Sequence, residues 1–391
     1  MLRIAIVGCG KVADQHVHAI HRIDDCRIVA LCDRELLMAK QLGERFDVSE
    51  CFSNVSEMLQ KTSPDVVHIT APPQSHFSLA RQCLDYGCHV YLEKPFTITT
   101  DEARSLVQLA KQQDLRITAG HNYQFTLEML QMRRLARSGF LGGQPSHLES
   151  YWSYDLSGSM YAGAFLGSRS HWVRQLPGQL FHNLISHGIA RLAEFLDDEI
   201  AEIIAIAHQS PRIRSLGGSD VLDELRVMIR DQGGTTAFFC FSTQLSPGLN
   251  QFRIYGPAGS LVADIITGSL IRNENRSYKS YLTYLIPPLK TAREHFRNAR
   301  LSVVNFLQRR LYQDFGMKEL MERFYNSIRL ETEPPIPYRE IILTARIMDE
   351  IFKQIYPGRK TDDGGQTTED GGRPLAHSSL VTNHSSLSQS E

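Results

Sequence analysis

A glycine-rich turn near the start of the chain constrains its fold more than any other feature. The apolar run Leu2–Val7 leads directly into the turn Gly8-Cys9-Gly10-Lys11-Val12-Ala13. Gly8 permits a tight turn, Gly10 lets the backbone approach a pyrophosphate, and Ala13 allows a helix to pack closely on a strand. The N-terminal amides of that helix point at the phosphates. The predicted dinucleotide-binding residues of this turn are Gly8, Gly10, Lys11, Val12 and Ala13.

The first third of the chain alternates short apolar runs with longer amphipathic stretches. The predicted strands are Arg3–Val7, Arg27–Asp33, Val66–Ala71, His89–Glu93 and Arg116–Gly120. Helical periodicity marks Val12–Ile23, Leu36–Phe46, Ser53–Gln60, Phe77–Tyr86 and Thr100–Gln112. Strands and helices in alternation predict an α/β domain with a doubly wound parallel sheet, a Rossmann domain over residues 1–122.

From residue 123 the pattern changes to one helix and a cluster of longer strands. The helix is predicted at Leu127–Arg137, and the strands at His147–Asp155, Ile200–Ala207, Glu224–Ile229, Thr235–Ser242, Gln251–Tyr255 and Ser260–Ile265. Such a cluster is typical of a mostly antiparallel sheet, so an α+β domain is expected over residues 123–357. A last helix, Tyr338–Ile355, follows a proline-rich segment. Residues 358–391, rich in Gly, Ser, Thr and Asp, are predicted to be disordered.

An acidic residue, Asp33, ends the second predicted strand. A carboxylate at this position accepts hydrogen bonds from both ribose hydroxyls and repels a 2′-phosphate, which favours NAD. Arg34 follows it and can stack on adenine or compensate a phosphate, so NADP stays open as an alternative. We predict NAD as the cofactor.

Composition limits the class of protein. The chain has 391 residues and a formal net charge of −1, which argues against a general nucleic-acid binder. No signal-peptide pattern precedes the first strand, and no apolar run reaches the ~20 residues of a membrane span. The seven cysteines form no Cys-x-x-Cys pair, so we expect reduced core thiols and a cytoplasmic protein. The sequence contains no convincing set of metal ligands.

Three further segments, taken in order with the glycine turn, resemble a known family. They are Ala71-Pro72-Pro73-Gln74-Ser75-His76, Glu93-Lys94-Pro95 and Gly178-Gln179-Leu180-Phe181-His182-Asn183-Leu184-Ile185-Ser186-His187. With these motifs the chain resembles the glucose–fructose oxidoreductase / inositol dehydrogenase (Gfo/Idh/MocA) family over residues 1–270 and 316–356. The resemblance implies a Rossmann domain followed by an open-faced sheet domain. It also implies NAD(P)-dependent oxidation or reduction of a hydroxyl carbon of a sugar, cyclitol or nucleotide sugar, by a homodimer or homotetramer.

The resemblance assigns roles to single residues. Lys94 is placed where nicotinamide meets substrate, and an ammonium there can bind a substrate hydroxyl and stabilise developing negative charge. Glu93 orients Lys94 or contacts the nicotinamide ribose. His187 is the candidate acid/base that takes the hydroxyl proton. The segment after the fourth strand contributes Ala71, Pro72 and His76 to the cofactor site, with simple packing as the alternative for His76.

Departures from the family pattern bear on the chemistry. Asn183 stands where the family has an Asp, one helical turn before His187 and on the same face. An amide can hold a substrate hydroxyl, but it cannot accept a proton. Gln124 stands where relatives often carry an arginine, so the usual substrate clamp is expected to be missing. The candidate catalytic residues are Lys94, His187 and Asn183.

Two alternative functions therefore stay open. One is a non-catalytic homologue that uses NAD as a structural or sensory group. The other is an NAD-assisted glycosidase or lyase, in which hydride leaves and returns within one turnover. Other histidines are interpreted as supporting the fold: His182 shares no helical face with His187, and His16, His18 and His21 are expected on a solvated or half-buried face of the first helix.

Residues 269–315 fit the family pattern least and are predicted to form a helical insert. One predicted helix face carries Lys290, Arg293, Arg297 and Arg300, and another carries Ala292, Phe296, Ala299 and Val303. We expect an amphipathic helix packed on the sheet, with its arginines in water. The alternative is a surface over residues 278–312 for an anionic ligand, either a nucleotide diphosphate or membrane phospholipid.

Overall fold

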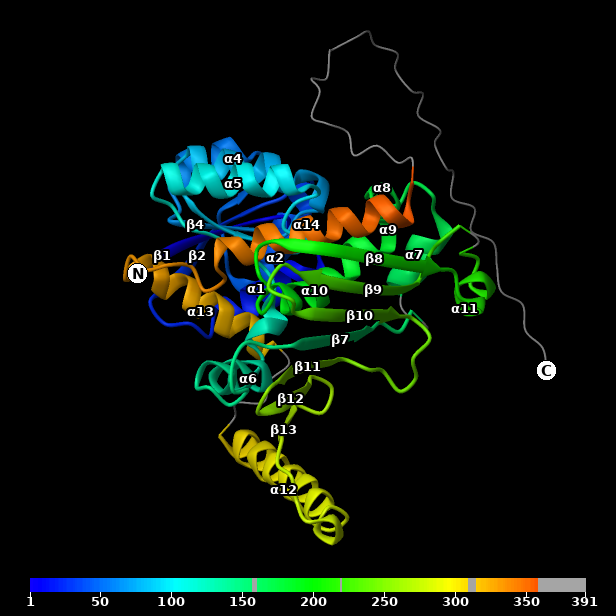
Figure 1. The fold of residues 1–391 in the computed structure, drawn as a ribbon. Coiled ribbons are helices and arrows are strands. Elements are labelled where there is room, and N and C mark those ends of the chain that lie inside the picture. Colours follow the sequence, from blue (N-terminus) through cyan, green and yellow to red (C-terminus); the bar gives the residue numbers. More distant parts are fainter. Residues whose placement is uncertain (157–159, 219, 309–313, 358–391) are drawn as a thin grey trace, which may run out of the picture. The chain divides into compact units, whose positions relative to one another are not determined.

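Two sheets with separate hydrophobic cores make up the folded chain (Figure 1). The computed structural model describes residues 1–156, 160–218, 220–308 and 314–357. The predicted disordered tail, residues 358–391, lies outside the described residues. Among the described helices, none is both long enough and apolar enough to cross a membrane.

The first sheet has six parallel strands in the order β3-β2-β1-β4-β5-β6. They are β1 (Leu2–Val7), β2 (Cys26–Cys32), β3 (Cys51–Phe52), β4 (Val66–Ile69), β5 (His89–Leu92) and β6 (Ile117–Ala119). The accompanying helices are α1 (Lys11–Ile20), α2 (Leu36–Phe46), α3 (Val55–Thr62), α4 (His76–Asp85) and α5 (Thr100–Gln112). The predicted doubly wound sheet is confirmed. The prediction lacks β3, because two residues are too few for a periodic signal.

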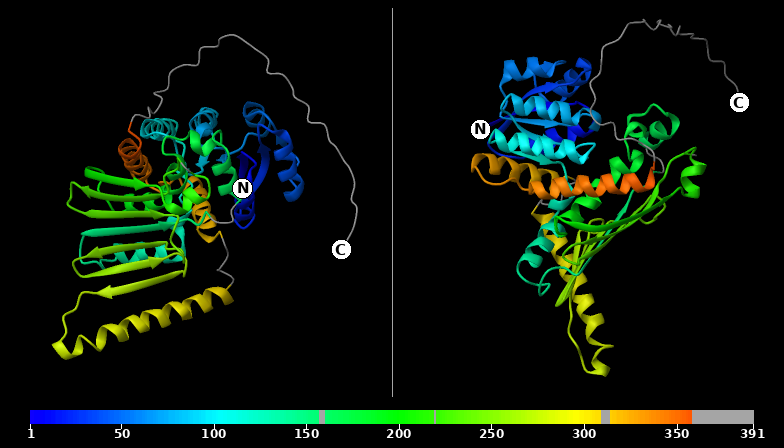
Figure 2. Two further views of the ribbon diagram at one scale, coloured as in Figure 1. Left: turned by 90° about the vertical axis from the view of Figure 1, so that its right-hand side faces the viewer. Right: turned by 45° about the horizontal axis from the view of Figure 1, so that its top comes forward.

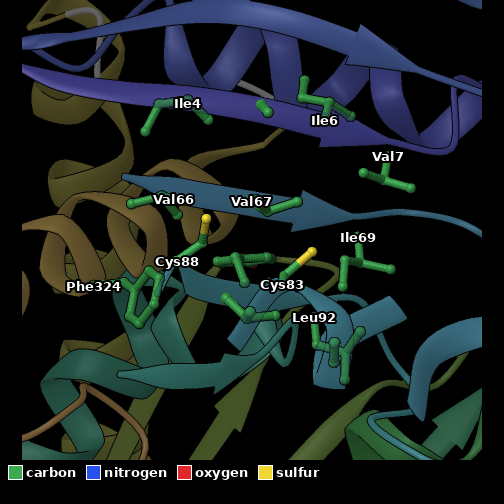
Figure 3. Packing of buried hydrophobic residues seen from close by; sticks show 14 of the residues in the cluster. Ile4, Ile6, Val7, Val66, Val67, Ile69, Cys83, Cys88, Leu92 and Phe324 are labelled. Atoms are coloured by element: carbon green, nitrogen blue, oxygen red, sulfur yellow. The ribbon is translucent and has the colours of Figure 1, made fainter. Parts of the chain in front are cut away.

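Continuous apolar strands bury both faces of this sheet (Figure 3). Ile4 and Ile6 of β1 and Val66 of β4 are fully buried, as expected for a parallel sheet covered by helices on both sides. Helix α13 (Phe315–Arg329) joins this core from far along the chain. Its Phe324 is 0% exposed and lies against the same cluster.

The second sheet has seven strands in the order β13-β12-β11-β7-β10-β9-β8. They are β7 (His147–Ser153), β8 (Ile200–His208), β9 (Glu224–Asp231), β10 (Thr236–Ser242), β11 (Gln251–Gly256), β12 (Gly259–Asp264) and β13 (Ser269–Glu274). Neighbours pair antiparallel except β7 and β10, which run parallel. The predicted mostly antiparallel sheet is therefore confirmed.

Helices cover one face of this second sheet (Figure 2). They include α6 (Leu127–Arg137), α7 (Met160–Gly167), α8 (Trp172–Gln175), α9 (Gln179–Leu184), α10 (Ser186–Ala193) and α14 (Tyr338–Ile355), and α11 (Pro211–Ser215) follows β8. The opposite face leaves Ile204, Ile206 and Met228 exposed, so the sheet is open-faced. Gly188 lets α10 approach β10 closely, because a Cβ there would lie 2.4 Å from the ring of Phe239.

The predicted helical insert, residues 269–315, begins as a strand rather than a helix. Residues 269–274 form β13 at the edge of the sheet, and helix α12 (Ile286–Leu307) follows. Helix α12 lies against β13 with a polar face, whose Glu294 and Asn298 are buried, whereas Phe296 is 79% exposed. The helix packs on the sheet edge with Arg293 and Arg300 exposed, as expected, but its apolar side faces away from the sheet. The physical reason is that an edge strand offers unpaired backbone groups, which polar side chains satisfy.

Removing the Phe324 side chain tests the place of α13 in the first core. Phe324→Ala should lower the free energy of unfolding by about 3–5 kcal/mol, because a fully buried ring is replaced by a cavity. Leu330→Ala, at a residue that is 71% exposed just beyond α13, is the control and should change it by less than about 0.5 kcal/mol. Urea denaturation measures both, and equal effects would contradict this packing.

Candidate functional site

The predicted site residues gather at the carboxyl ends of the parallel strands. Gly8 follows β1, Asp33 follows β2, Ala71 lies just beyond β4, and Glu93 follows β5. The strand order reverses between β1 and β4, and ligands of doubly wound sheets bind in the crevice at such a point.

The glycine turn has the geometry of a phosphate cradle. Gly8 has φ +95°, and a Cβ there would lie 2.5 Å from the backbone nitrogen of Ala71. Only glycine fits this position. Beside Gly10 nothing lies within 4 Å of where a Cβ would stand, so the backbone is open to an approaching group. Helix α1 begins at Lys11 without a side-chain cap, and Val12 at its start is 38% exposed. These residues fit a dinucleotide.

Asp33 lies beside this turn, as the sequence predicts for the ribose-binding acid. Its Oδ2 accepts a hydrogen bond of 2.7 Å from the backbone N–H of Cys9, and its Oδ1 accepts one of 2.9 Å from the N–H of Glu35. Each carboxylate oxygen keeps a second lone pair for a ligand hydroxyl. Arg34 is exposed beside it.

His76 links two loops of the site. Its Nε2 lies 2.9 Å from the carbonyl oxygen of Ala71, and its Nδ1 lies 2.9 Å from that of Pro95. The side chain is fully buried, and burial lowers the pKa of the imidazole. Pro72, by contrast, is exposed in the loop after β4. His76 therefore holds the Ala71 loop against the loop that carries Lys94.

Glu93 is a buried carboxylate with partners on both oxygens. Oε2 accepts a hydrogen bond from the backbone N–H of Lys94 at 3.0 Å, and Oε1 lies 3.0 Å from Nε2 of His16. Burial raises the pKa of Glu93, but the hydrogen bond from His16 and the charge of Lys94 outweigh it and hold the pKa below its usual value. A Cβ at Gly120 would lie 2.6 Å from Oε1, so a glycine leaves the room for this carboxylate.

A chain of buried hydrogen bonds continues from Glu93 into the Rossmann core. Nδ1 of His16 lies 2.9 Å from Nδ1 of His68, and Nε2 of His68 lies 2.7 Å from the hydroxyl of Tyr325 in α13. One proton assignment satisfies every atom: Tyr325 donates to His68, His68 to His16, and His16 to Glu93. Burial holds the pKa of His68 well below its usual range, which agrees with a neutral ring.

This chain of hydrogen bonds corrects one sequence-based expectation. His16 is not on a solvated or half-buried face but is 0% exposed, because α1 turns this residue toward the sheet. His18, in contrast, is exposed. The residues that pair with His16 are His68 of β4 and Glu93 just after β5, so no local pattern predicts these contacts.

Lys94 extends from the first domain to the second. Its ammonium Nζ donates to the carbonyl oxygen of Asn183 at 3.0 Å and to the side-chain Oδ1 of Asn183 at 3.4 Å. Burial lowers the pKa of Lys94, and the charge of Glu93 opposes that shift. The Lys94–Pro95 peptide bond is cis. The structure thus brings together two of the predicted catalytic residues.

His187 lies at the start of α10. Asn183 lies in the last turn of the preceding helix α9, so the two residues stand on two short helices that meet at Ile185 rather than on one. The His187 ring packs edge-to-face on Tyr123 with 4.7 Å between ring centroids, and 5.5 Å from Trp152. Burial and the charge of Lys94 hold the pKa of His187 well below its ordinary value. The imidazole is therefore neutral and able to accept a proton.

Several buried polar atoms near these residues have no partner within the described part of the chain. They are both ring nitrogens of His121, Nδ1 of His187, and Nε and Nη1 of Arg191. The rings of His121 and His187 are 6.0 Å apart, and the Arg191 guanidinium lies 5.0 Å from the centre of the Trp152 ring. Buried polar groups are normally hydrogen-bonded, so this cluster marks a place where a bound polar molecule completes the network.

Sequence reasoning missed His121, Tyr123 and Arg191. Two of these residues carry a sequence signal. His121 lies two residues after the parallel strand β6, and Arg191 lies one helical turn beyond His187. Gln124, by contrast, does not face Lys94, because its amide donates to the carbonyl oxygen of Ala190 at 3.3 Å inside the second domain. His182 stacks on Phe352, with 4.9 Å between ring centroids, and supports the fold as expected.

Two family models match the chain. A model of an oxidoreductase family with an NAD-binding Rossmann fold matches residues 2–121, and a GFO/IDH/MocA C-terminal domain matches residues 129–262. The chain belongs to the Gfo/Idh/MocA oxidoreductase family. Its Rossmann domain is of the NAD-binding kind, and NAD is its cofactor.

Several proteins similar to this chain are named as dehydrogenases. D-glucoside 3-dehydrogenase of Escherichia coli (strain K12) is 34% identical over 143 residues, which are 36% of this chain and 40% of that protein. D-apiose dehydrogenase of Paraburkholderia graminis is 25% identical over 313 residues, 77% of either chain. A Bordetella pertussis dehydrogenase, solved with NADH and UDP-GlcNAcA, shares the fold with a TM-score of 0.70 and 16% identity, covering 92% of this chain and 96% of that one.

Buried neutral histidines predict a pH-dependent stability. The pKa is lowered by burial in His68, His76, His121, His182 and His187. Below the unfolded value of about 6.5 the unfolded chain binds more protons than the folded one. The free energy of unfolding should therefore fall as the pH drops from about 7 to 5, by up to ~1.4 kcal/mol per pH unit for each histidine.

Chemical denaturation across this pH range measures the loss. For His121 and His182 the loss should continue down to the folded pKa of about 4. His182→Phe keeps the stack on Phe352 and should make the pH dependence shallower, whereas His18→Gln at an exposed position should leave it unchanged. An unchanged slope in His182→Phe would contradict the buried, neutral state.

Proposed function

We propose that the chain oxidises a hydroxyl carbon of a sugar, cyclitol or nucleotide sugar with NAD. The observation that carries this proposal is the position of Lys94, His121, His187 and Arg191 around one buried polar cluster. Unpaired donors and acceptors in such number suit a ligand with several hydroxyls. The named dehydrogenases of glucosides and apiose support the same class of substrate.

The cofactor would lie along the carboxyl ends of the strands. Gly8, Gly10 and the start of α1 would hold the pyrophosphate, and Asp33 the adenosine ribose. When bound, NAD supplies the hydride acceptor. Glu93 is committed to His16 and to the backbone of Lys94, so we assign it to orienting the loop that carries the lysine.

Lys94 and His187 would divide the polar chemistry. The Lys94 ammonium donates a hydrogen bond to the reacting hydroxyl and stabilises the negative charge that develops on its oxygen. His187, neutral because of its burial, accepts the hydroxyl proton. Asn183 accepts a hydrogen bond from Lys94 through Oδ1 and so holds the ammonium in place. This contact gives the amide a positioning role that needs no proton transfer.

The unpaired polar atoms beside Lys94 bear on the two rival functions. A sensor that binds NAD alone requires no such atoms, whereas Nδ1 of His187 and both ring nitrogens of His121 have no partner among the described residues. An NAD-assisted glycosidase or lyase uses the same groups, so the product distinguishes it. A sugar and nucleotide-sugar panel with added NAD separates the three: a dehydrogenase accumulates NADH, a glycosidase releases aglycone without net NADH, and a sensor does neither.

Substitution of the two proposed catalytic residues tests the site. Lys94→Ala should lower kcat by roughly 10²–10³-fold and His187→Ala by roughly 10²–10⁴-fold, because each removes a group that acts in the transition state. NAD should still raise the melting temperature of both variants. Lys61→Ala, at an exposed lysine of α3, is the matched control and should keep full turnover. Full turnover in either site variant would overturn the assignment.

Asp33 should determine the choice of NAD. Asp33→Ser removes the proposed contact with the ribose hydroxyls and the repulsion of a 2′-phosphate. The Kd for NAD should rise about tenfold or more, and the preference over NADP should shrink. Calorimetric titration with both nucleotides measures the change. A Kd for NAD that stays the same in Asp33→Ser would contradict the assignment.

We further propose that the protein is cytoplasmic and forms a homodimer or homotetramer through its open sheet face. All seven cysteines are free thiols, which supports a reducing compartment. Ile204, Ile206 and Met228 are 47%, 66% and 60% exposed on neighbouring strands, which supports an interface on this face. Light scattering of Ile206→Glu against the natural chain tests the assembly.

A further inference from the structure

Polar side chains hold helix α12 to the second sheet. The helix lies along β13, beyond the edge of the sheet (Figure 2). Its buried residues are Glu294 and Asn298. The Asn298 side chain accepts from the N–H of Leu270 at 3.2 Å and donates to the Leu270 carbonyl oxygen at 2.9 Å. The Glu294 carboxylate accepts from the side chain of Arg272 at 2.7 Å.

The opposite face of α12 is apolar and exposed. Its apolar residues recur with alternating spacings of three and four, which places them on one side of a helix. They are Leu285, Leu289, Ala292, Phe296, Ala299, Val303 and Phe306. Leu289, Phe296 and Phe306 are 60%, 79% and 70% exposed. This series is called the outer face of α12 below.

So large an exposed stripe needs a partner. Burying a Leu or Phe side chain stabilises by about 1.5–3 kcal/mol, and contiguous apolar patches on soluble proteins usually mark an interaction site. No described part of the chain covers the outer face. The stripe therefore meets something outside the described residues.

Charge indicates what kind of partner fits. Between Tyr278 and Gln308 the only acidic residue is Glu294, and it is engaged by Arg272. The basic residues of this segment are Lys279, Lys290, Arg293, Arg297 and Arg300. Arg293 and Arg300 are exposed and follow Ala292 and Ala299 of the outer face by one residue, so they stand along its border. Lys290 pairs with Glu274 and Arg297 with Glu294, each at 3.0 Å, so the positive charge of this border comes from Arg293 and Arg300.

A second copy of α12 is a poor partner for this face. If two α12 helices packed antiparallel through their outer faces, the residues just after Ala292 and Ala299 would flank the contact and face the equivalent residues of the other helix. Arg293 and Arg300 would then oppose the same arginines of the other helix, with no acidic residue on the border to compensate. An anionic lipid surface accepts the apolar residues and the arginines together, as amphipathic interfacial helices do.

We propose that α12 is a peripheral membrane anchor that lies in the surface of an anionic bilayer. The outer face would enter the boundary between headgroups and acyl chains, with Arg293 and Arg300 at the phosphates. The hydrogen bonds of Asn298 and Glu294 to β13 would fix the helix to the second sheet. With the helix axis parallel to the membrane surface, these bonds would also set the orientation of the enzyme on that surface. This inference does not depend on the proposed reaction.

Vesicle flotation of the full chain tests the anchor. The natural protein should float with vesicles of phosphatidylcholine and phosphatidylglycerol in equal amounts, and much less with phosphatidylcholine alone. Phe296→Ser combined with Phe306→Ser should reduce binding at least about tenfold, because two apolar groups no longer enter the bilayer. Arg293→Gln combined with Arg300→Gln, which removes charge but keeps good helix formers, should also reduce it about tenfold or more.

Matched controls distinguish a membrane anchor from an interface between two copies of the chain. Leu330→Ser, just beyond α13 and 71% exposed, should leave flotation unchanged. Equal flotation of all variants, or no flotation of the natural chain, would overturn the proposal. A change in molar mass by light scattering in the phenylalanine variant, without any vesicle binding by the natural chain, would assign the outer face to a second copy instead. NAD binding reports that each variant is folded.

Discussion

The buried carboxylate of Glu93 is the group on which the site depends. It fixes the backbone of Lys94 with one oxygen and meets His16 of the first helix with the other. Through His16 and His68 it reaches Tyr325 of α13, a helix far along the chain. The same carboxylate requires the small Gly120 beside it. Helix α1, strand β4, helix α13 and the loop after β6 thus fix the position of Glu93, and Glu93 in turn fixes the backbone from which Lys94 reaches the second domain.

That lysine is also a direct polar link between the two domains at the site. Its ammonium binds the carbonyl and the side chain of Asn183, so the departure from an acid at position 183 has a structural consequence. An Asp would form an ion pair with Lys94, whereas the neutral amide leaves the ammonium with its full charge and a proton to donate. Burial, and after it the charge of Lys94, lowers the pKa of the neighbouring His187.

The sequence predicts the parts of the site that lie at strand ends, and misses those that depend on packing between distant elements. The glycine turn, Asp33 and Glu93-Lys94-Pro95 can be predicted locally, because the residue types that form a turn or end a strand are neighbours in the sequence. The hydrogen bonds between His16 and His68 and between His68 and Tyr325 join three elements, and only the packed core brings them together. Likewise the orientation of α12 depends on the free edge of β13, a strand that the prediction lacks.

The polar attachment of α12 has a consequence for how the sheet can grow. Asn298 and Glu294 occupy backbone and side-chain groups of β13 that an incoming strand would otherwise pair with. A seven-stranded sheet with one open face carries a risk of uncontrolled polymerisation through its border strand. Because α12 covers the β13 edge of the sheet, another chain can pack on the open sheet face but cannot add a strand beside β13. Asn298 thereby leaves the backbone N–H and C=O of Leu270 engaged and closed to an incoming strand.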